Sequence, residues 1–306
     1  MKVAVLAGGV GGARFLRALT ETTDPAAVTA IVNVGDDLEI AGLYVAPDLD
    51  TVLYTLAGLS DEERGWGRDG ETWHALETLR ELGGDAWFAL GDRDLGLHLA
   101  RTQALRAGEP LSAVTTRLAA AAGLELRVLP ATDDRLRTWL ETPDGTFEFQ
   151  EWFVRRRHAD PVDGVRFEGA DTARPAPGVV EALDEADVIA IAPSNPYVSI
   201  WPILSVAPIR AAVENRRVPC VAVSPLIGGR AVKGPAAEML ERLAGGTAPA
   251  HVASTYEGLV DVLVIDPADD PAEASVRTVV TPTLLDEADV RRRVAEVVLD
   301  VAGAPA

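Results

Sequence analysis

The chain has 306 residues, 48% of them hydrophobic, which is enough for one large α/β unit or for a core with an inserted subdomain. Its formal net charge of −19 argues against a nucleic-acid partner, because that binding depends on basic contacts to phosphates. We also expect no membrane association and a cytoplasmic location, because no apolar stretch approaches the roughly twenty residues of a membrane span and no signal peptide precedes the first predicted strand.

The first predicted element is a buried strand at residues 3–7, and four glycines lie within the next five residues. The apolar pattern of residues 15–19 then has helical spacing. Glycines let the backbone bend and approach a ligand, and the first N–H groups of a helix favour an anion. This turn therefore predicts a phosphate site. The dinucleotide motif G-x-G-x-x-G fits poorly, because its last position falls on Arg14.

A second buried strand is predicted at residues 27–34, which makes the start of the chain a strand–helix–strand unit. Such units predict a parallel sheet whose ligands lie at the carboxyl ends of the strands. Strand patterns return at residues 188–192, 218–223, 263–266 and 276–281. We predict an α/β fold with a Rossmann-like, mostly parallel sheet and helices on both faces.

The middle of the chain is predicted to form an inserted cap, residues 59–175, between two parts of a nucleotide-binding core, residues 1–58 and 176–306. The cap begins with helical patterns at residues 71–82, 95–107 and 111–122. From Arg127 onward its composition is typical of short strands, including one at residues 146–154. We expect this second part to be a small β-rich insert with a hairpin.

Four carboxylates follow the second strand, Asp36 and Asp37 at its end and Asp48 and Asp50 in the next loop. Hard oxygen ligands beside a phosphate site suit Mg²⁺, which usually takes one or two carboxylates and leaves its other positions to water and phosphate oxygens. In the structural alternative, the first two residues form a turn and Asp50 caps a helix. Spacing alone leaves both interpretations open.

Trp66, Trp73 and His74 lie near charged loops and could stack on a planar heterocycle, or they are ordinary core and rim residues. No second histidine stands at ligand spacing, so a zinc site is not expected. The triple arginine at residues 155–157 is the local excess of positive charge. It either holds an anionic substrate group or faces solvent from an edge strand.

Two later loops, residues 193–199 and 224–235, follow predicted strands of the same sheet. Because the carboxyl ends of parallel strands share one edge, both loops should lie beside the glycine turn. Their hydroxyl, amide and glycine groups suit a nucleotide, with Lys233 as a cation, although small polar residues also fill ordinary loops.

Six motifs stand in order along the chain, at Leu6–Arg14, Asn33–Asp37, Pro47–Thr51, Leu90–Asp94, Ala192–Pro196 and Ser224–Gly229. With this combination the chain closely resembles the 2-phospho-L-lactate transferase family of coenzyme F420 biosynthesis over nearly its whole length. The resemblance implies transfer of a phospholactyl or phosphoenolpyruvyl group from a guanosine diphosphate conjugate to the ribityl hydroxyl of the deazaflavin Fo, releasing GMP. It also implies a Mg²⁺-dependent, cytoplasmic homodimer.

For this reaction we assign the metal to Asp36 and Asp50, and we count Asp37 with them as catalytic, with Asp48 in reserve. Either an acidic residue or metal-bound water accepts the alcohol proton, and the sequence does not choose. The nucleotide and donor are assigned to Gly9, Val10, Gly11, Gly12, Arg14, Arg156, Ser194, Asn195, Ser199, Gly228 and Lys233. The deazaflavin is assigned to Trp66, Thr72, Trp73, His74 and Asp92.

Two other functions stay open from the sequence. A non-catalytic nucleotide-sugar-binding regulator of the gluconeogenesis-factor type resembles this family in its glycine turn and core, although the carboxylates and the tryptophans of the cap argue against it. A nicotinamide oxidoreductase is suggested by the strand, glycine turn and helix alone, and the mismatch at Arg14 argues against it.

Overall fold

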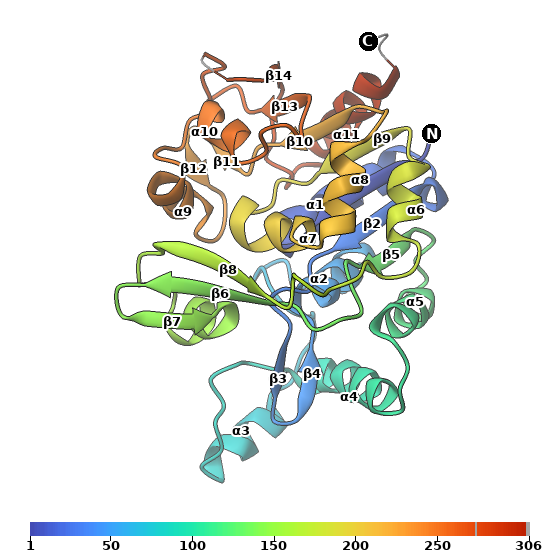
Figure 1. Ribbon diagram of the computed structural model, residues 1–306. Coiled ribbons are helices and arrows are strands. Elements are labelled where there is room, and N and C mark those ends of the chain that lie inside the picture. Colours follow the sequence, from blue (N-terminus) through green and yellow to red (C-terminus); the bar gives the residue numbers. More distant parts are fainter. Residues whose placement is uncertain (273, 304–306) are drawn as a thin grey trace.

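The structure is a computed structural model that describes residues 1–272 and 274–303 (Figure 1). Its largest sheet has seven strands in the order β14-β13-β10-β9-β1-β2-β5, and neighbouring strands run parallel. The strands are β1 (Val3–Ala7), β2 (Val28–Val32), β5 (Arg127–Pro130), β9 (Val188–Ile191), β10 (Cys220–Val223), β13 (Val262–Ile265) and β14 (Arg277–Val280). The predicted α/β fold with a parallel sheet is confirmed.

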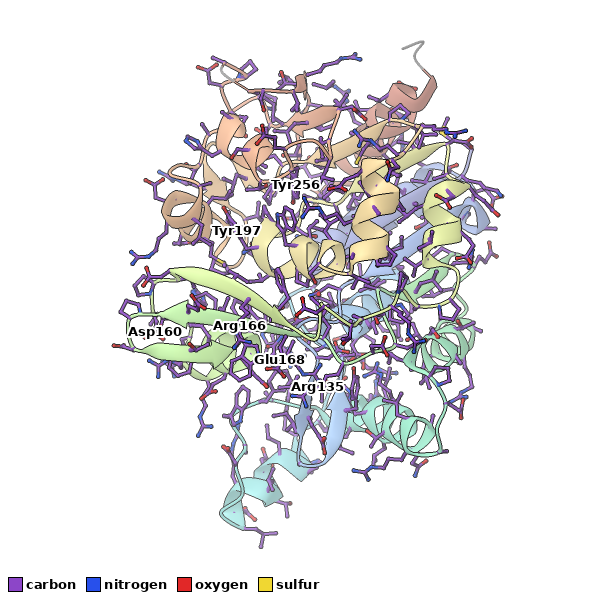
Figure 2. The ribbon with its side chains drawn as sticks, in the orientation of Figure 1. Arg135, Asp160, Arg166, Glu168, Tyr197 and Tyr256 are labelled. Carbon is purple, nitrogen blue, oxygen red and sulfur yellow. The ribbon has the colours of Figure 1, made fainter. Side chains whose placement is uncertain are left out.

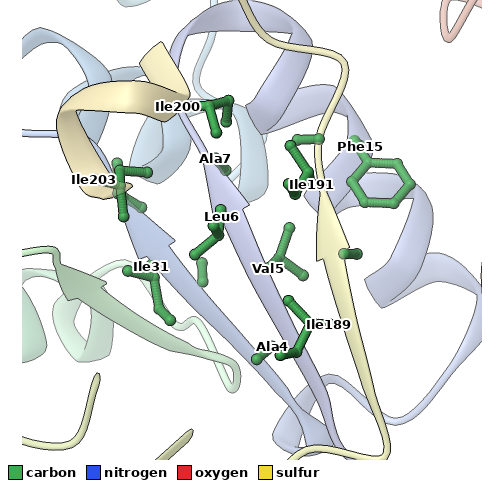
Figure 3. Packing of buried hydrophobic residues seen from close by; sticks show 14 of the residues in the cluster. Ala4, Val5, Leu6, Ala7, Phe15, Ile31, Ile189, Ile191, Ile200 and Ile203 are labelled. Atoms are coloured by element: carbon green, nitrogen blue, oxygen red, sulfur yellow. The ribbon is translucent and has the colours of Figure 1, made fainter. Parts of the chain in front are cut away.

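Continuous apolar runs explain why these strands form the centre of the sheet. Every residue of β1, β2, β9, β10 and β13 is buried, as expected for parallel strands covered on both faces. Figure 3 shows the packing around β1, in which Leu6 pairs with Ile31 of β2 and with Ile191 of β9. The hydrophobic core is therefore built around the first strand.

The chain leaves the middle of the sheet in two directions. From β1 it runs to β2 and β5, and from β9 it runs to β10, β13 and β14. Parallel crossovers are right-handed, so opposite directions place their helices on opposite faces. The directions diverge between β1 and β9, and such a switch point leaves a crevice at the carboxyl ends of the strands. The sheet thus positions a ligand site beside the loops that follow β1 and β9.

Helices cover the sheet. α1 (Gly9–Thr22) packs against α2 (Pro47–Leu56) and α11 (Ala288–Gly303). Figure 1 shows three more helices in front of the sheet: α6 (Val179–Asp184), α7 (Trp201–Leu204) and α8 (Ala207–Glu214). The other helical segments of this part are η1 (Pro25–Ala27), η3 (Pro196–Ile200), α9 (Ala236–Leu243) and α10 (Pro249–Ser254).

Within the described part of the chain, no single helix has the length and apolar character of a membrane span. One bent pair of segments, Pro196–Leu204 with Ala207–Glu214, meets the length and composition criteria only when both are counted together.

Two segments project from this core (Figure 1). The first lies between β2 and β5; apart from α2, which packs on the core, it contains β3 (Leu38–Ile40), β4 (Leu43–Val45), α3 (His74–Glu81), α4 (Asp92–Arg106) and α5 (Leu111–Ala121). The second, which we call the β lobe, spans residues 137–168 and contains β6 (Arg137–Thr142), β7 (Gly145–Glu148), η2 (Glu151–Arg155) and β8 (Gly164–Glu168). Its sheet is antiparallel, in the order β7-β6-β8. A short hairpin of β11 (Leu226–Ile227) and β12 (Arg230–Ala231) follows β10.

The predicted β-rich insert was wrong at both of its ends. The strand at Arg127 belongs to the main sheet as its edge strand β5, where it pairs with β2, so residues 59–175 do not form one continuous cap. The strand predicted at residues 146–154 ends at Glu148, and Glu151–Arg155 forms a turn of π-helix. Such turns occur frequently at functional sites.

Two local features near the carboxylates decide what the sequence left open or did not show. Helix α2 begins at Pro47, because proline suits the first position of a helix, so Asp50 does not cap it. The β3–β4 hairpin was not predicted. Its turn residues Ala41 and Gly42 have φ values of 50° and 75°, which suit a two-residue hairpin turn.

Replacing Ile189 by alanine tests the packing of the central strands. Ile189 is fully buried in β9 and pairs with Ala4 and Cys220. We expect the substitution to lower the free energy of unfolding by about 3 kcal/mol, because it removes buried methyl groups and leaves a cavity. Urea unfolding measures the change. The control Leu82→Ala removes a side chain that is 81% exposed and should change the value by less than about 0.5 kcal/mol. An equal loss of unfolding free energy in both variants would contradict the packing of Ile189 in the core.

Candidate functional site

A cavity of about 710 Å³ lies at the carboxyl ends of the central strands. Its volume falls in the range of small-molecule sites, roughly 300–1,000 Å³. The loops after β1, β2, β9 and β10 contribute to its wall, as do α2, α4, the β lobe and residues 283–285. The cavity therefore occupies the crevice that the strand order creates.

The glycine turn forms one wall of the cavity. Gly8 is the extended N-cap of α1, whose first turn has no acidic residue and no side-chain cap. A Cβ atom on Gly8 would lie 2.5 Å from Asp48 Oδ2, and one on Gly11 would collide with the carbonyl oxygen of Pro193. Only glycine fits these two close approaches. The N–H groups at the start of α1 thus lie beside the cavity, where they favour an anion.

The loop after β9 is joined to this turn. The Ser194 hydroxyl donates a 2.7 Å hydrogen bond to the carbonyl oxygen of Gly8. Asn195 accepts a 3.0 Å hydrogen bond from the backbone N–H of Tyr197 and so caps η3. The predicted nucleotide residues that line the cavity are Gly9, Val10, Gly11, Arg14, Ser194, Asn195, Ser199 and Lys233. The structure brings them together, and their role in nucleotide binding stays a prediction.

Asn33 connects two of the four carboxylates. Its side-chain amide is fully buried and donates 2.9 Å hydrogen bonds to Asp36 Oδ1 and to Asp48 Oδ2. The other oxygen of Asp36 accepts a 3.0 Å hydrogen bond from Gln150 of the β lobe. Gln150 was not singled out in the sequence, because its partner is more than a hundred residues away.

Burial and mutual repulsion control the protonation of these carboxylates. Burial, followed by the charges of Asp48 and Asp37, raises the pKa of Asp36 well above its ordinary value. Burial also raises the pKa of Asp48 to about 6, although the hydrogen bond from Asn33 opposes this shift. A cation in the cavity would relieve the repulsion and favour the ionised carboxylates.

Asp37 and Asp50 have other partners. Burial raises the pKa of Asp37 to about 8, while a 2.6 Å hydrogen bond from the Tyr44 hydroxyl opposes the shift. Asp37 does not line the cavity, whereas Asp50 does. Both oxygens of Asp50 accept hydrogen bonds from the guanidinium of Arg101, one of them 3.0 Å long. Arg101 was missed in the sequence, although it shares one face of α4 with Asp94 and His98.

The predicted deazaflavin residues are only partly at the cavity. Trp66 lines it, and Trp73 lies edge-on to Trp66 with ring centres 6.3 Å apart. Asp92 instead accepts hydrogen bonds from the Thr72 hydroxyl and from the backbone N–H groups of His74 and Ala75. Thr72, Trp73, His74 and Asp92 do not line the cavity, so Asp92 organises the start of α3 there. Five aromatic residues that the sequence analysis did not select line the wall: Tyr54, Trp87, Phe88, Phe149 and Phe153.

Three predicted donor residues also lie outside the lining. Arg156 forms an ion pair with Asp160, with Nε 2.6 Å from Oδ2, and Figure 2 shows Asp160 on the outer part of the β lobe. Gly228 is in the turn of the β11–β12 hairpin with a φ of 56°. Gly12 lies under the turn, where a Cβ atom would come within 3.1 Å of Ala7 Cβ. The expected contact between Arg156 and the donor carboxylate is therefore not supported.

The fold and the cavity define a class: a Rossmann-like α/β protein with a glycine turn at a helix N-terminus and buried carboxylates in one crevice. The family model described as 2-phospho-L-lactate transferase CofD matches residues 3–301, and the chain belongs to this family. The predicted family is thus confirmed, and the chain is a transferase of coenzyme F420 biosynthesis.

Relatives are similar over nearly the full length. Phosphoenolpyruvate transferase of Streptomyces coelicolor is 44% identical over 99% of this chain and 98% of its own length. The phosphoenolpyruvate transferase of Nocardia farcinica is 42% identical over 99% of this chain and 95% of its own length. A crystal structure of a UPF0052-family protein from Bacillus halodurans superposes with a TM-score of 0.63 at 20% identity, covering 97% of this chain and 98% of that one. This last likeness concerns the fold.

Asp37 gives the unfolding free energy a pH dependence of defined sign. Its pKa is about 8 in the folded protein and about 3.9 for an exposed aspartate. Between these values the folded state holds one more proton than the unfolded state, so stability falls as pH rises, by at most about 1.4 kcal/mol per unit. We expect Asp37→Asn to remove this part of the slope in urea unfolding between about pH 5 and about pH 8. If the unfolding free energies of the variant and the wild type changed with pH by the same slope, the raised pKa of Asp37 would be contradicted.

Proposed function

We propose that the chain transfers a phosphoenolpyruvyl or phospholactyl group from a guanosine diphosphate conjugate to the ribityl hydroxyl of the deazaflavin Fo. The hydroxyl oxygen forms a bond to the phosphorus that bears the organic acid, the bond from that phosphorus to GMP breaks, and GMP leaves. The observation that carries the proposal is one cavity lined by the glycine turn, four carboxylates and several aromatic rings. The names of the relatives favour the enolpyruvyl donor.

The donor diphosphate belongs at the start of α1. In a chain with a net charge of −19, a diphosphate requires local positive groups. The N–H groups of the glycine turn supply partial charge, and Arg14 and Lys233 line the same cavity. These groups would stabilise the charge that develops on the phosphoryl oxygens during transfer.

The carboxylates fit a divalent cation. Asp36 and Asp50 are the proposed ligands, and Asp48 is held against Asp36 by Asn33. Each proposed ligand is oriented by a protein hydrogen bond, as ligating carboxylates commonly are. In residues 1–272 and 274–303 no group of three or more His, Cys, Asp or Glu side chains forms a ready metal site, which accords with Mg²⁺ because it usually takes one or two carboxylates. When bound, Mg²⁺ would neutralise charge on the diphosphate.

The acceptor belongs at the aromatic wall. Trp66, Trp87, Phe88, Phe149 and Phe153 border the cavity, and flat rings favour stacked or edge contacts with a planar heterocycle. The alcohol proton would pass to Asp36 or Asp48, because a raised pKa suits a general base. A homodimer and a cytoplasmic location stay predictions.

The direct test is an assay of Fo with each guanosine diphosphate conjugate and Mg²⁺, with products identified by mass spectrometry. We expect Fo to gain the mass of the phosphorylated acid less one water while GMP is released. If the protein bound guanosine or sugar nucleotides but left Fo unmodified with both conjugates, a non-catalytic nucleotide-sugar-binding regulator would be the better interpretation.

Asp36→Asn separates catalysis from folding. The raised pKa of Asp36 shows that its neutral form suits the buried site better than its charged form, so the neutral amide should leave stability at about pH 8 unchanged or higher. Turnover should fall at least roughly 100-fold, because a metal-binding charge and a proton acceptor are lost. Steady-state rates and thermal unfolding measure both effects. Asp171 is exposed, and the control Asp171→Asn should leave both values near wild type. Near-normal turnover of Asp36→Asn would mean that Asp36 does not bind the cation.

A further inference from the structure

Helices α2 and α4 are joined by a polar ladder. We use this name for Asp50 and Tyr54 of α2 together with Asp94, His98 and Arg101 of α4. The α2 residues are four apart, and the α4 residues are four and three apart, so each set lies on one helix face. The ladder fastens α4, which lies in the projecting segment, to α2, the core helix that carries Asp48 and Asp50.

Contacts run along the whole ladder. Arg101 grips both oxygens of Asp50 with its guanidinium, and its Nη1 lies 3.3 Å from Nδ1 of His98. On the other side of the ring, His98 Nε2 lies 3.3 Å from Asp94 Oδ1. Asp94 also accepts a hydrogen bond from the Tyr54 hydroxyl. The chain of contacts therefore extends from Asp50 to Tyr54 through three side chains of α4.

The polar ladder adds little to stability for a contact between two helices, because its charged groups are buried. The buried residues of α4 are His98, Arg101, Thr102 and Ala104, without a large aliphatic side chain among them. Arg101 and His98 are each 1% exposed. Among the described residues, Arg101 Nε has no hydrogen-bond partner, and the 3.3 Å approach of His98 Nε2 to Asp94 lacks hydrogen-bond geometry. Burial of charged groups is costly even when they are paired, and apolar residues of similar size are often as stable or more so. A contact kept only for stability would not need this composition.

The position of the ladder indicates its purpose. Asp50, Tyr54, Asp94 and His98 line the cavity, whereas Arg101 lies behind them and does not. We propose that Arg101 is a positioning residue for the transfer reaction, which acts by fixing the Asp50 carboxylate at the cavity wall. This inference rests on the proposed function, in which Asp50 holds the cation.

The planar fork of arginine explains the residue type. Two parallel N–H groups fix the orientation of a carboxylate, whereas lysine offers a single point charge. His98 packs against the fork one turn earlier in α4, so it limits the rotation of the guanidinium. The outer lone pairs of Asp50 stay directed to the cavity, where a cation can use them.

A double-mutant cycle between Arg101 and Asp50 tests the inference. In the wild-type background, Arg101→Gln should lower kcat at least tenfold and change the KM of either substrate less than threefold. In the Asp50→Asn background the same change should alter kcat less than twofold, because the group through which Arg101 acts is gone. An equal factor in both backgrounds, or an unchanged kcat in the single variant, would overturn it.

Binding of Mn²⁺ alone, followed by electron paramagnetic resonance, gives a readout that does not depend on turnover. Arg101→Gln should weaken Mn²⁺ binding at least tenfold when Asp50 is present and less than twofold in Asp50→Asn. Undiminished binding in Arg101→Gln would overturn the inference. If the wild type made no product but bound Mn²⁺ with this dependence, the proposed function would be wrong and the role of Arg101 would stand.

The control is Arg106→Gln, at the end of the same helix. Arg106 is exposed and donates to the carbonyl oxygen of Gly42, so its replacement should leave kcat and Mn²⁺ binding within twofold of wild type. Arg101→Lys is the second variant if Arg101→Gln does not fold. It keeps the charge without the fork, and we expect a loss of kcat at least fivefold in the wild-type background and less than twofold in Asp50→Asn. Full activity of Arg101→Lys would overturn the role of the fork.

Discussion

The rest of the site depends on the buried amide of Asn33. Its backbone N–H continues the sheet by donating to the carbonyl oxygen of Ala7. Its side-chain nitrogen contacts Asp36, Asp48 and the carbonyl oxygen of Val198, and its side-chain oxygen accepts from the N–H of Gly35. One residue at the end of β2 therefore fixes the end of β1, the first turn of α2 and η3 relative to one another. Without Asn33, the N–H groups of the glycine turn would have no fixed position relative to the carboxylates on the other side of the cavity.

Around this amide, negatively charged groups outnumber positively charged groups at the cavity wall. Four carboxylates border a single crevice, and the buried guanidinium that approaches them is already engaged by Asp50. Asp36 and Asp48 have raised pKa values because burial and like charge disfavour two anions in so small a space. A cation in the crevice would relieve this repulsion, as the proposed function requires. Perturbed carboxylates of this kind are typical of functional sites rather than of the core.

The sequence was sufficient for the parts of the molecule that local patterns determine. Apolar runs such as residues 3–7 predicted the central strands, and their parallel order brought the turn after β1 and the loop after β9 together, as expected. The positions of Asp36 and Asp50 on the cavity wall followed from the same reasoning. Gln150 and Arg101 could not be found in this way, because their partners are distant in sequence and depend on how the β lobe and α4 fold back onto the core.

The errors at the cap have a related physical cause. Trp73 and His74 were assigned to a ligand from residue type alone, yet Asp92 uses its oxygens to satisfy the first N–H groups of α3, a demand that every helix end makes. In contrast, Phe149 and Phe153 reach the cavity because the predicted strand at residues 146–154 gives way to a π-helical turn. Residue type indicates what a side chain can do, but backbone hydrogen bonding decides which residues are free to do it.

The likeness to a UPF0052-family structure shows that this backbone is compatible with very different sequences, since only 20% of the residues are identical. Buried aliphatic strands tolerate exchange when volume and pattern are kept. Exchange of a hydrogen-bonded group such as Asn33, Gln150 or Arg101 would leave its buried carboxylate partner without a donor, which is costly. The chemistry that we propose for this chain therefore lies in a small polar layer at the strand ends, which the apolar sheet positions but does not specify.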